Sequence, residues 1–400
     1  VMPHFEKMAD DNAMLLRNYL IGYYVFGDIF YKEIAEGMIR FIGSVLSDPE
    51  GGFYTSQDAD VMADDEGGYF TWTNDEIRDV LDEDEFEVVS LHLLHDAGTM
   101  HHNSSKKVLY AAMNAEEISV LLEKDLQEVK SLIGRAKEKL LNARNNRETP
   151  YIDTTMYTSN NGMFISAYIL GYRMLNDITL KEFAVKSIDK IMKTRFINGT
   201  LFHSEGTEAL FDDYVHIMDA LISVYEVTGE ARYMDLADEL MDICINKLWD
   251  KENGGFYDST DKLLGIQIKG IEDVPHPSPN SICIKVLLKL HFMTGNERYY
   301  KYAEKALELF SGHAMEMGIH AGYYFCALDS YFNTLNLNIY SASDSTLSKA
   351  VLASFTPHMN MLYGEDRDSV VPCFKSVCYE PVNNPEDWKC FLQEKHQNIV

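Results

Sequence analysis

Apolar residues recur every three or four positions along most of the chain, which is the spacing of one face of an α-helix. Within 213–227, for example, Ile217, Leu221, Val224 and Tyr225 follow this rule. The same pattern predicts further helices at 9–28, 30–46, 73–94, 115–145, 160–175, 179–194, 233–248, 282–292, 299–310 and 320–332. We therefore expect an all-α fold.

Short polar turns join these helices into pairs. The sequences Thr-Gly-Glu at 228–230 and Thr-Gly-Asn at 294–296 each follow a helix end, where glycine is the usual left-handed cap. A helical hairpin repeated along a chain is typical of a repeat architecture. About eleven helices precede residue 334, which is one short of six hairpins.

A second repeat lies between the hairpins. Gly-Gly-Phe-Tyr occurs at 51–54 and again at 254–257, and Gly-Gly-Tyr-Phe occurs at 67–70. Two glycines followed by two aromatic residues predict a turn that enters a short β-hairpin. Each of the first two copies follows a predicted helix, which again indicates repetition of one supersecondary unit.

The pattern changes after residue 334. Alternating apolar and polar residues at 335–340 predict a strand, 343–355 reads as a helix, and 360–363 is another short apolar run. We therefore expect two parts, a helical-hairpin barrel at 1–334 and a small α/β subdomain at 335–400.

The composition excludes several functions. There are 35 Lys and Arg against 63 Asp and Glu, a net charge of −28, whereas nucleic acids and anionic membranes need clustered positive charge. Hydrophobic residues make up 46%, enough for a large core and too many for a disordered acidic chain. The sequence contains no run of about 18 consecutive apolar residues, so it predicts no membrane span. We expect neither a nucleic-acid nor a membrane partner.

Six scattered cysteines are too few for a disulfide scaffold and favour a reducing cytoplasm. Those at 244, 283 and 326 lie on apolar helical faces, where buried thiols are expected. For the pair Cys373 and Cys378 zinc binding, a disulfide or redox role, and plain packing all remain open. The first residues, Val-Met-Pro-His-Phe-Glu-Lys, are not a signal peptide and read like the middle of a longer protein.

Candidate chemistry lies in polar loops next to helix starts, because rigid helices can position such loops around a cavity. His4 and Glu6 precede the first helix. Asp58 and Asp60 follow the first Gly-Gly-Phe-Tyr turn, and alternate residues of an extended segment face one side. Paired carboxylates at this spacing suit acid–base work or sugar-hydroxyl binding. A solvated acidic loop is the alternative interpretation.

Three later loops have similar features. Of the adjacent Asp212 and Asp213 at a helix start, one is expected to cap the helix and the other to face the cavity. Prolines stiffen the loop that holds His276 and Asn280, and Asn161 lies in a polar helix entry. His216 lies on an apolar helix face, where a hydrogen-bonded core histidine is the first interpretation.

Several motifs occur in order along most of the chain. They are Pro-His-Phe-Glu-Lys-Met at 3–8, Gly-Gly-Phe-Tyr-Thr-Ser-Gln-Asp-Ala-Asp at 51–60, Tyr-Phe-Thr-Trp-Thr at 69–73, Phe-Asp-Asp-Tyr at 211–214, Trp-Asp-Lys-Glu-Asn-Gly-Gly-Phe-Tyr at 249–257, Pro-Ser-Pro-Asn-Ser at 277–281, and Cys373 with Cys378. Together they resemble the thioredoxin-domain-containing family that includes spermatogenesis-associated protein 20. The resemblance implies an N-terminal thioredoxin-like domain in the full-length protein, followed by an (α/α)6 barrel similar to N-acylglucosamine 2-epimerases and six-hairpin glycosidases. Relative to the family pattern, the loops 153–162 and 273–281 are altered, which implies a different ligand or a reduced activity if they line the cavity.

The working hypothesis is a carbohydrate-active cytoplasmic protein, epimerase- or isomerase-like or glycosidase-like, with an acidic, aromatic-lined cavity. Aromatic faces stack on sugar rings, and carboxylates or histidines move protons. The candidate catalytic residues are Glu6, Asp58, Asp60, Asp213, His4 and His276. The candidate substrate-binding residues are Phe53, Tyr54, Trp72, Asn161, Tyr214, Tyr257 and Asn280. We expect a small carbohydrate ligand, no cofactor and no metal ion. The alternatives are a non-catalytic module that serves the thioredoxin-like domain in redox maintenance or quality control, and an acidic scaffold with a decayed pocket.

Overall fold

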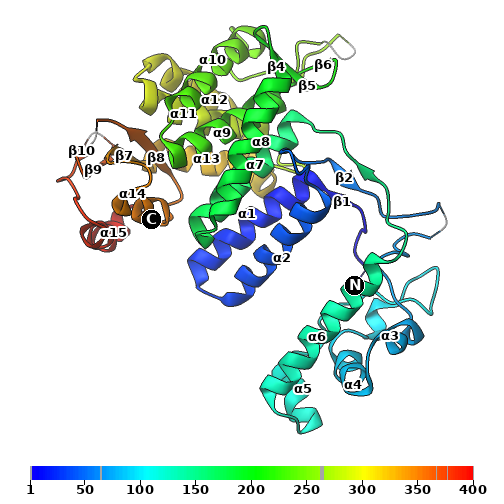
Figure 1. Ribbon diagram of the computed structural model, residues 1–400. Helices are drawn as coiled ribbons and strands as arrows, with labels where there is room; N and C mark the ends of the chain where they lie inside the picture. Colours follow the sequence, from blue (N-terminus) through cyan, green and yellow to red (C-terminus); the bar gives the residue numbers. More distant parts are fainter. Residues whose placement is uncertain (1, 64, 262–264, 366, 376, 400) are drawn as a thin grey trace. The chain divides into compact units, whose positions relative to one another are not determined.

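The periodic apolar residues fold into long helices that pair as hairpins. The computed structural model describes residues 2–63, 65–261, 265–365, 367–375 and 377–399 (Figure 1). The inner helices pack against one another in chain order: α1 (Ala9–Phe26), α7 (Thr158–Leu175), α9 (Phe211–Thr228), α11 (Pro279–Thr294) and α13 (Gly322–Asn333). Each of the first four is followed by an outer helix: α2 (Ile29–Val45), α8 (Ile178–Arg195), α10 (Ala231–Leu248) and α12 (Glu297–Met317). The predicted all-α class, with the alternating helices of an (α/α)6 barrel, is confirmed.

Burial separates the inner from the outer helices. Nearly every residue of α9 from Asp213 to Val227 is buried, whereas α10 buries one stripe that includes Tyr233, Leu240 and Cys244. A helix buried on all sides is central, and a helix with one apolar stripe covers the outside. The predicted glycine caps are present, since Gly229 and Gly295 end α9 and α11 in the left-handed conformation.

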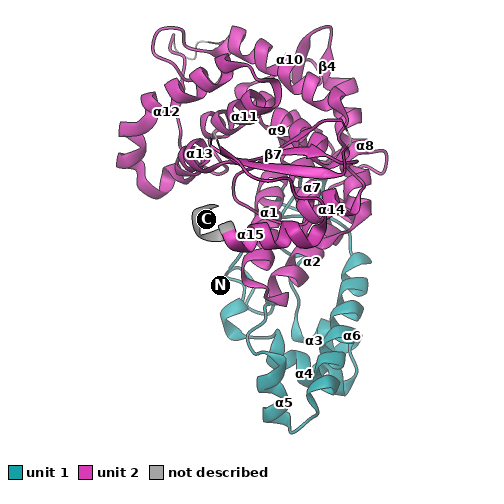
Figure 2. Ribbon diagram, turned by 90° about the vertical axis from the view of Figure 1, so that its left-hand side faces the viewer, with its two compact units in different colours: residues 1–8, 56–153 teal, residues 9–55, 154–400 magenta. Residues whose placement is uncertain are grey.

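A separate compact unit interrupts this barrel. Residues 1–8 and 56–153 form unit 1, and residues 9–55 and 154–400 form unit 2 (Figure 2). Unit 1 contains a sheet of β1 (Lys7–Met8), β2 (Ser56–Gln57) and β3 (Ile152–Asp153), in that order, with both neighbouring pairs antiparallel. Its helices are α3 (Asn74–Val80), α4 (Glu83–His92), η1 (Asp96–Gly98), α5 (Ala115–Leu122) and α6 (Leu126–Asn145).

The helices of unit 1 have two small hydrophobic cores of their own. One gathers Trp72, Ile77 and Leu140, and the other gathers Ile118 and Val129. The helices expected at 73–94 and 115–145 were counted among the barrel hairpins, and the structure instead places them here. The second of these is divided into two helices, because Glu123 adopts a left-handed conformation between α5 and α6.

The last part of the chain has the predicted mixture of strands and helices. Its sheet has the order β10 (Val377–Cys378), β9 (Ser369–Phe374), β7 (Leu335–Tyr340), β8 (Met359–Tyr363), and α14 (Thr346–Leu352) connects the parallel pair β7 and β8. The helix α15 (Pro385–Ile399) follows. Contacts group these elements with the barrel helices in unit 2. A domain boundary between residues 334 and 335 stays a proposal.

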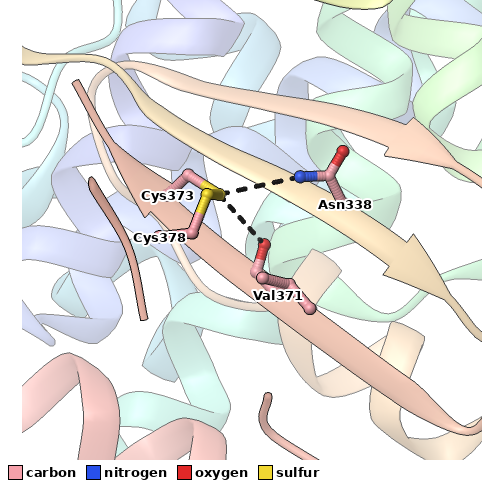
Figure 3. The surroundings of a disulfide bond; sticks show 4 residues. All are labelled: Asn338, Val371, Cys373 and Cys378. Atoms are coloured by element: carbon pink, nitrogen blue, oxygen red, sulfur yellow. Dashed lines mark hydrogen bonds between the residues drawn. A yellow bond between two sulfur atoms is a disulfide. The ribbon is translucent and has the colours of Figure 1, made fainter. Parts of the chain in front are cut away.

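Two cysteines of this sheet are bonded. Cys373 and Cys378 are partners in the β9–β10 register and form a disulfide of 2.04 Å, with the Asn338 side-chain amide 3.7 Å from Cys373 Sγ (Figure 3). This arrangement is one of the three alternatives left open by the sequence. Cys244 and Cys283 are the expected buried thiols, whereas Cys326 is exposed. None of the described helices is long and apolar enough to cross a lipid bilayer.

Candidate functional site

The N-terminus of α9 brings three polar side chains together in unit 2. Asp212 lies in the first turn of α9 and His216 one turn later, so both occupy the same helix face. His216 Nε2 lies 3.2 Å from Asp212 Oδ1. His276 comes from the proline-rich loop before α11, and its ring meets the His216 ring edge to face, with 5.8 Å between centroids. We call these three residues the Asp–His–His cluster.

The loop that carries His276 is held by Asp273. Its carboxylate accepts hydrogen bonds from the backbone N–H of Ser278 and of Tyr323, both at 2.8 Å. Ser278 then caps α11 by accepting from the N–H of Ser281, and Pro279 opens the helix. These contacts fix the backbone on which the imidazole of His276 is mounted.

Two atoms of the Asp–His–His cluster are unsatisfied. Asp212 Oδ1 and His216 Nε2 are buried, yet neither makes a hydrogen bond of good geometry to any described residue. Buried polar atoms are normally hydrogen-bonded. The two atoms have only each other, as an ion pair at 3.2 Å, so a core histidine paired with its neighbour stays the alternative to a ligand-binding one.

The carboxyl groups around this cluster have contrasting pKa values. Burial raises the pKa of Asp212, but the charges of His216 and His276 and hydrogen bonds outweigh it, so the net pKa is lowered. Burial and, secondly, the charge of Asp212 raise the pKa of Asp258 to about 6. One carboxyl is thus held ionised, while another keeps its proton to near neutral pH.

The same three side chains could hold a metal ion. A carboxylate oxygen of Asp212 and one ring nitrogen each of His216 and His276 lie within 4.8 Å of one another. Histidine and carboxylate ligands suit zinc and similar divalent ions. No metal was expected from the sequence, whereas this geometry accepts one.

Asp213, the aspartate selected from the sequence, has a different role. Its carboxylate accepts from the N–H of Leu210 and of Ser159, both at 2.9 Å, and from Nδ1 of His203. His203 lies on β5 (Thr200–Ser204), which pairs with β4 (Phe196–Ile197) and β6 (Thr207–Glu208). Asp213 is therefore the capping aspartate and Asp212 the one facing the cluster, the reverse of the expected assignment.

The two asparagines expected to bind substrate instead hold the repeated turns. Asn161 Oδ1 accepts from the N–H of Phe53 at 2.8 Å, and its Nδ2 donates to the Phe53 carbonyl at 3.1 Å. Asn280 makes the same pair of bonds with Phe256, at 2.9 and 3.0 Å. Both side chains are fully buried. Each therefore clamps one Gly-Gly-Phe-Tyr turn onto the start of an inner helix.

Most of the expected aromatic platforms are buried. Phe53 packs against Phe164, with centroids 4.6 Å apart, and is fully buried. Trp72 of unit 1 lies under the guanidinium of Arg147 at 3.9 Å, and Tyr214 is buried in the barrel core. Their ring faces are covered by protein. Of this group, Tyr54 and Tyr257 are the partly exposed ones.

The remaining predicted catalytic residues belong to unit 1. His4 is exposed, and Glu6 is partly exposed just before β1. Asp58 and Asp60 are half-buried in the loop after β2, where the Asp58 N–H donates to the Tyr151 carbonyl at 2.9 Å. The expected set is thus divided between the units, with Asp213 and His276 in unit 2.

No protein-family model matches this chain. Human spermatogenesis-associated protein 20 is 28% identical over 350 residues, which cover 78% of this chain and 44% of that protein. The chain is thus similar in sequence to spermatogenesis-associated protein 20. An uncharacterized protein of Caenorhabditis elegans is also 28% identical, over 78% of this chain and 47% of its own length. The chain thus spans less than half of the curated relatives it matches.

Solved structures give partial superpositions. A D-mannose isomerase aligns with 77% of the chain and 75% of its own, at 12% identity and a TM-score of 0.39. A GH76 α-mannanase of Bacteroides thetaiotaomicron aligns with 56% of the chain and 67% of its own, at 16% identity and a TM-score of 0.38. The architecture given above rests on the helices of this chain alone.

Two residues of the site carry signals in the sequence that can be recognised. Asp212 and His216 stand at i and i+4 of a predicted helix, the spacing at which two side chains meet. His203 has no such signal, because its partner Asp213 is reached only after a β-hairpin folds back on the helix start.

Proposed function

We propose that the chain is a carbohydrate-active protein of the isomerase or epimerase class, with the Asp–His–His cluster as its acid–base centre. The observation that carries this proposal is the Asp212–His216 pair beside His276: the facing atoms Oδ1 and Nε2 lie 3.2 Å apart, are buried, and have no further partner of hydrogen-bond geometry among the described residues. Similarity to spermatogenesis-associated protein 20 leaves the reaction open, so the chemistry is argued from the cluster.

Two neighbouring imidazoles suit proton transfer at a carbon next to a carbonyl. A neutral imidazole removes the proton from that carbon, leaving an enediolate, and the imidazolium or its neighbour returns a proton to the adjacent carbon or the opposite face. The ionised Asp212 stabilises the imidazolium formed in this step. General acid–base groups of this kind contribute about 100-fold to 10,000-fold in rate.

Hydrolysis of a glycosidic bond is the second candidate. It is favoured by the contrast between Asp258, whose pKa is raised to about 6, and Asp212, whose pKa is lowered. A protonated carboxylic acid beside an ionised carboxylate is the pair that glycoside hydrolases use. In this mechanism Asp258 protonates the leaving oxygen and Asp212 acts as base or nucleophile.

A non-catalytic binding module is the third candidate, favoured by the buried rings of Phe53, Trp72 and Tyr214. In this proposal unit 2 binds a ligand or a protein partner and so serves a thioredoxin-like domain of the full-length protein, in the cytoplasm. The catalytic roles of Glu6, His4, Asp58 and Asp60 stay predictions. That Tyr54 or Tyr257 contacts a sugar is also a proposal.

The test is incubation with a panel of aldoses, ketoses and disaccharides in D₂O, followed by proton NMR. Conversion, or deuterium entry at the carbon next to the carbonyl, supports isomerase chemistry, and release of a reducing end supports hydrolysis. We expect His216→Gln and His276→Gln each to lower isomerisation by about 100-fold or more, with the exposed His313→Gln as control. Binding without turnover supports the module, and no binding at millimolar sugar contradicts all carbohydrate proposals.

A further inference from the structure

A cavity lies between the inner helices and the segment 355–360, which leads into the start of β8. It has a volume of about 120 Å³ and is lined by α1, α7, α9, α11 and α13. Along α9 it begins at Asp219 and reaches Glu226, about two and four turns beyond Asp212. A smaller cavity of about 30 Å³, which His216 lines, shares Arg17, Ser166, Asp219 and Lys285 with it, so the larger cavity adjoins the acid–base centre proposed above. We call the larger one the central cavity.

The central cavity is cationic in an acidic protein. Four cationic side chains line it, with two carboxylates, those of Asp219 and Glu226. The lining therefore carries two net positive charges, whereas the whole chain carries −28. The cations are Arg17, Arg173, Lys285 and Lys289.

The two carboxylates are already engaged. Glu226 accepts from Lys289 Nζ at 3.1 Å and lies 4.0 Å from Arg173. Asp219 accepts from the hydroxyl of Ser166 at 3.1 Å and lies 3.8 Å from Arg17. Each carboxylate therefore already lies within 4.0 Å of at least one other cation of the lining.

Lys285 differs from the other three cations of the lining, because it forms no ion pair with a carboxylate of the described residues. Its ammonium makes no hydrogen bond or ion pair with any residue that the structure describes. Burial lowers its pKa, Asp219 partly opposes this, and the charges of Arg17 and Lys289 lower it further. An unpaired ammonium among other cations is unfavourable unless an anion accompanies it.

Two neutral polar atoms in the same lining are also unsatisfied. Thr356 Oγ1 and His358 Nδ1 are buried without a hydrogen-bond partner among the described residues. The other ring nitrogen of His358 lies 2.8 Å from Asp329 Oδ2. Unsatisfied cationic, hydroxyl and imidazole groups on one cavity wall match an anion that offers several oxygens and hydroxyl groups.

We propose that the central cavity binds a small dianionic ligand of the phosphate-monoester class, with Lys285 as its principal contact. The two negative charges of such a group equal the excess positive charge of the lining. Its oxygens accept from Lys285, Arg17 and the Thr356 hydroxyl, and a hydroxyl of the ligand donates to His358 Nδ1.

The test is calorimetric titration of the whole chain with inorganic phosphate, glucose 6-phosphate and malonate at constant ionic strength. We expect saturable binding of inorganic phosphate or glucose 6-phosphate, weakened about tenfold or more in Lys285→Met, since hydrogen bonds to charged groups contribute this much. The exposed Lys193→Met is the control and binds as the parent chain does.

A second readout uses the chain without added anion. Lys285→Met removes an unpaired, partly buried charge and is expected to raise the unfolding temperature, whereas removing a structurally paired lysine lowers it. If Lys285→Met does not fold, Arg17→Gln and Thr356→Val are titrated in its place with the same expected loss. No saturable binding of either phosphate compound, binding of malonate alone, or equal binding by these variants overturns the proposal.

Discussion

Nδ1 of His203 lies 2.9 Å from each carboxylate oxygen of Asp213, and its ring stacks on Tyr157 with 4.4 Å between centroids. The hydrogen bond to Asp213 is the largest cause that raises the pKa of His203 above its usual 6.5. Because the folded value is raised, the stabilisation is fully present below pH 6.5 and is lost as the pH rises through the folded pKa.

The first prediction follows from the raised pKa of His203. His203→Gln lowers the free energy of unfolding most at acidic pH, and its difference from the parent chain shrinks above neutrality. Denaturant unfolding of both proteins between pH 5 and 9 measures this, with the exposed His313→Gln as control. A difference that does not change with pH contradicts the assignment.

The two asparagine clamps are predicted to be structural. Asn161→Ala and Asn280→Ala each leave a buried backbone N–H and carbonyl unsatisfied and cost about 3 kcal/mol of unfolding free energy. The two losses are similar, because the hydrogen bonds to Phe53 and Phe256 are alike. Denaturant unfolding measures both. The exposed Asn18→Ala on α1 is the control, and a loss of sugar binding at unchanged stability would favour substrate contact instead.

Two glycine substitutions are predicted to have opposite signs. Gly52 has φ of +95°, and an added Cβ would stand 2.8 Å from Met156 Sδ, so Gly52→Ala destabilises by about 1 kcal/mol or more. Gly43 lies in α2 with open space around it, so Gly43→Ala stabilises by about 0.5–1 kcal/mol. Thermal unfolding midpoints of the two variants measure this. A stabilising Gly52→Ala would show that the turn tolerates another backbone conformation.

The pH profile of any glycosidase activity tests the role of Asp258. As the general acid it must be protonated, so turnover falls as the pH rises above about 6. Asp258→Asn removes this limb and lowers turnover by about 100-fold or more. The exposed Asp261→Asn serves as control. A limb that persists in Asp258→Asn assigns the titration to another group.

Zinc is predicted to inhibit the isomerase reaction. Zn²⁺ occupies Asp212, His216 and His276 and removes the imidazoles from proton transfer, while a chelator leaves the reaction unchanged. Calorimetry is expected to show Zn²⁺ binding that Asp212→Asn weakens and the exposed Asp235→Asn does not. Turnover that requires added metal would instead make the cluster a metal centre.

Local patterns predicted the helices well, because the apolar residues of a segment such as 213–227 must meet a core wherever that core is. These patterns could not show whether a helix packs in the core of the barrel or in a core of unit 1. Ile77 and Ile118 have the same spacing as barrel residues, yet they pack within unit 1. Helical spacing alone therefore predicts barrel hairpins at 73–94 and 115–145, whereas tertiary contacts place these helices in unit 1.

The site was harder to predict, because it depends on which of two adjacent groups meets a distant partner. Asp212 and Asp213 have equal capping propensities, and the choice was decided by the backbone N–H of Ser159, more than fifty residues away. Likewise, Gly-Gly-Phe-Tyr predicts a turn at 51–54 without showing that Phe53 points inward. That direction depends on distant partners, among them Asn161, which bonds the Phe53 backbone, and Phe164, which packs on its ring.

The stretch 56–153 enters and leaves unit 1 through paired strands, with Ser56 opposite Asp153, while in unit 2 the Thr55 hydroxyl donates to the Thr155 carbonyl at 2.7 Å. This hydrogen bond therefore joins the two segments of the barrel between which residues 56–153 are inserted. Shortening or replacing residues 58–151, which lie between the paired strands β2 and β3, would leave this junction in place. The same junction gives protein engineers a natural place to graft another domain.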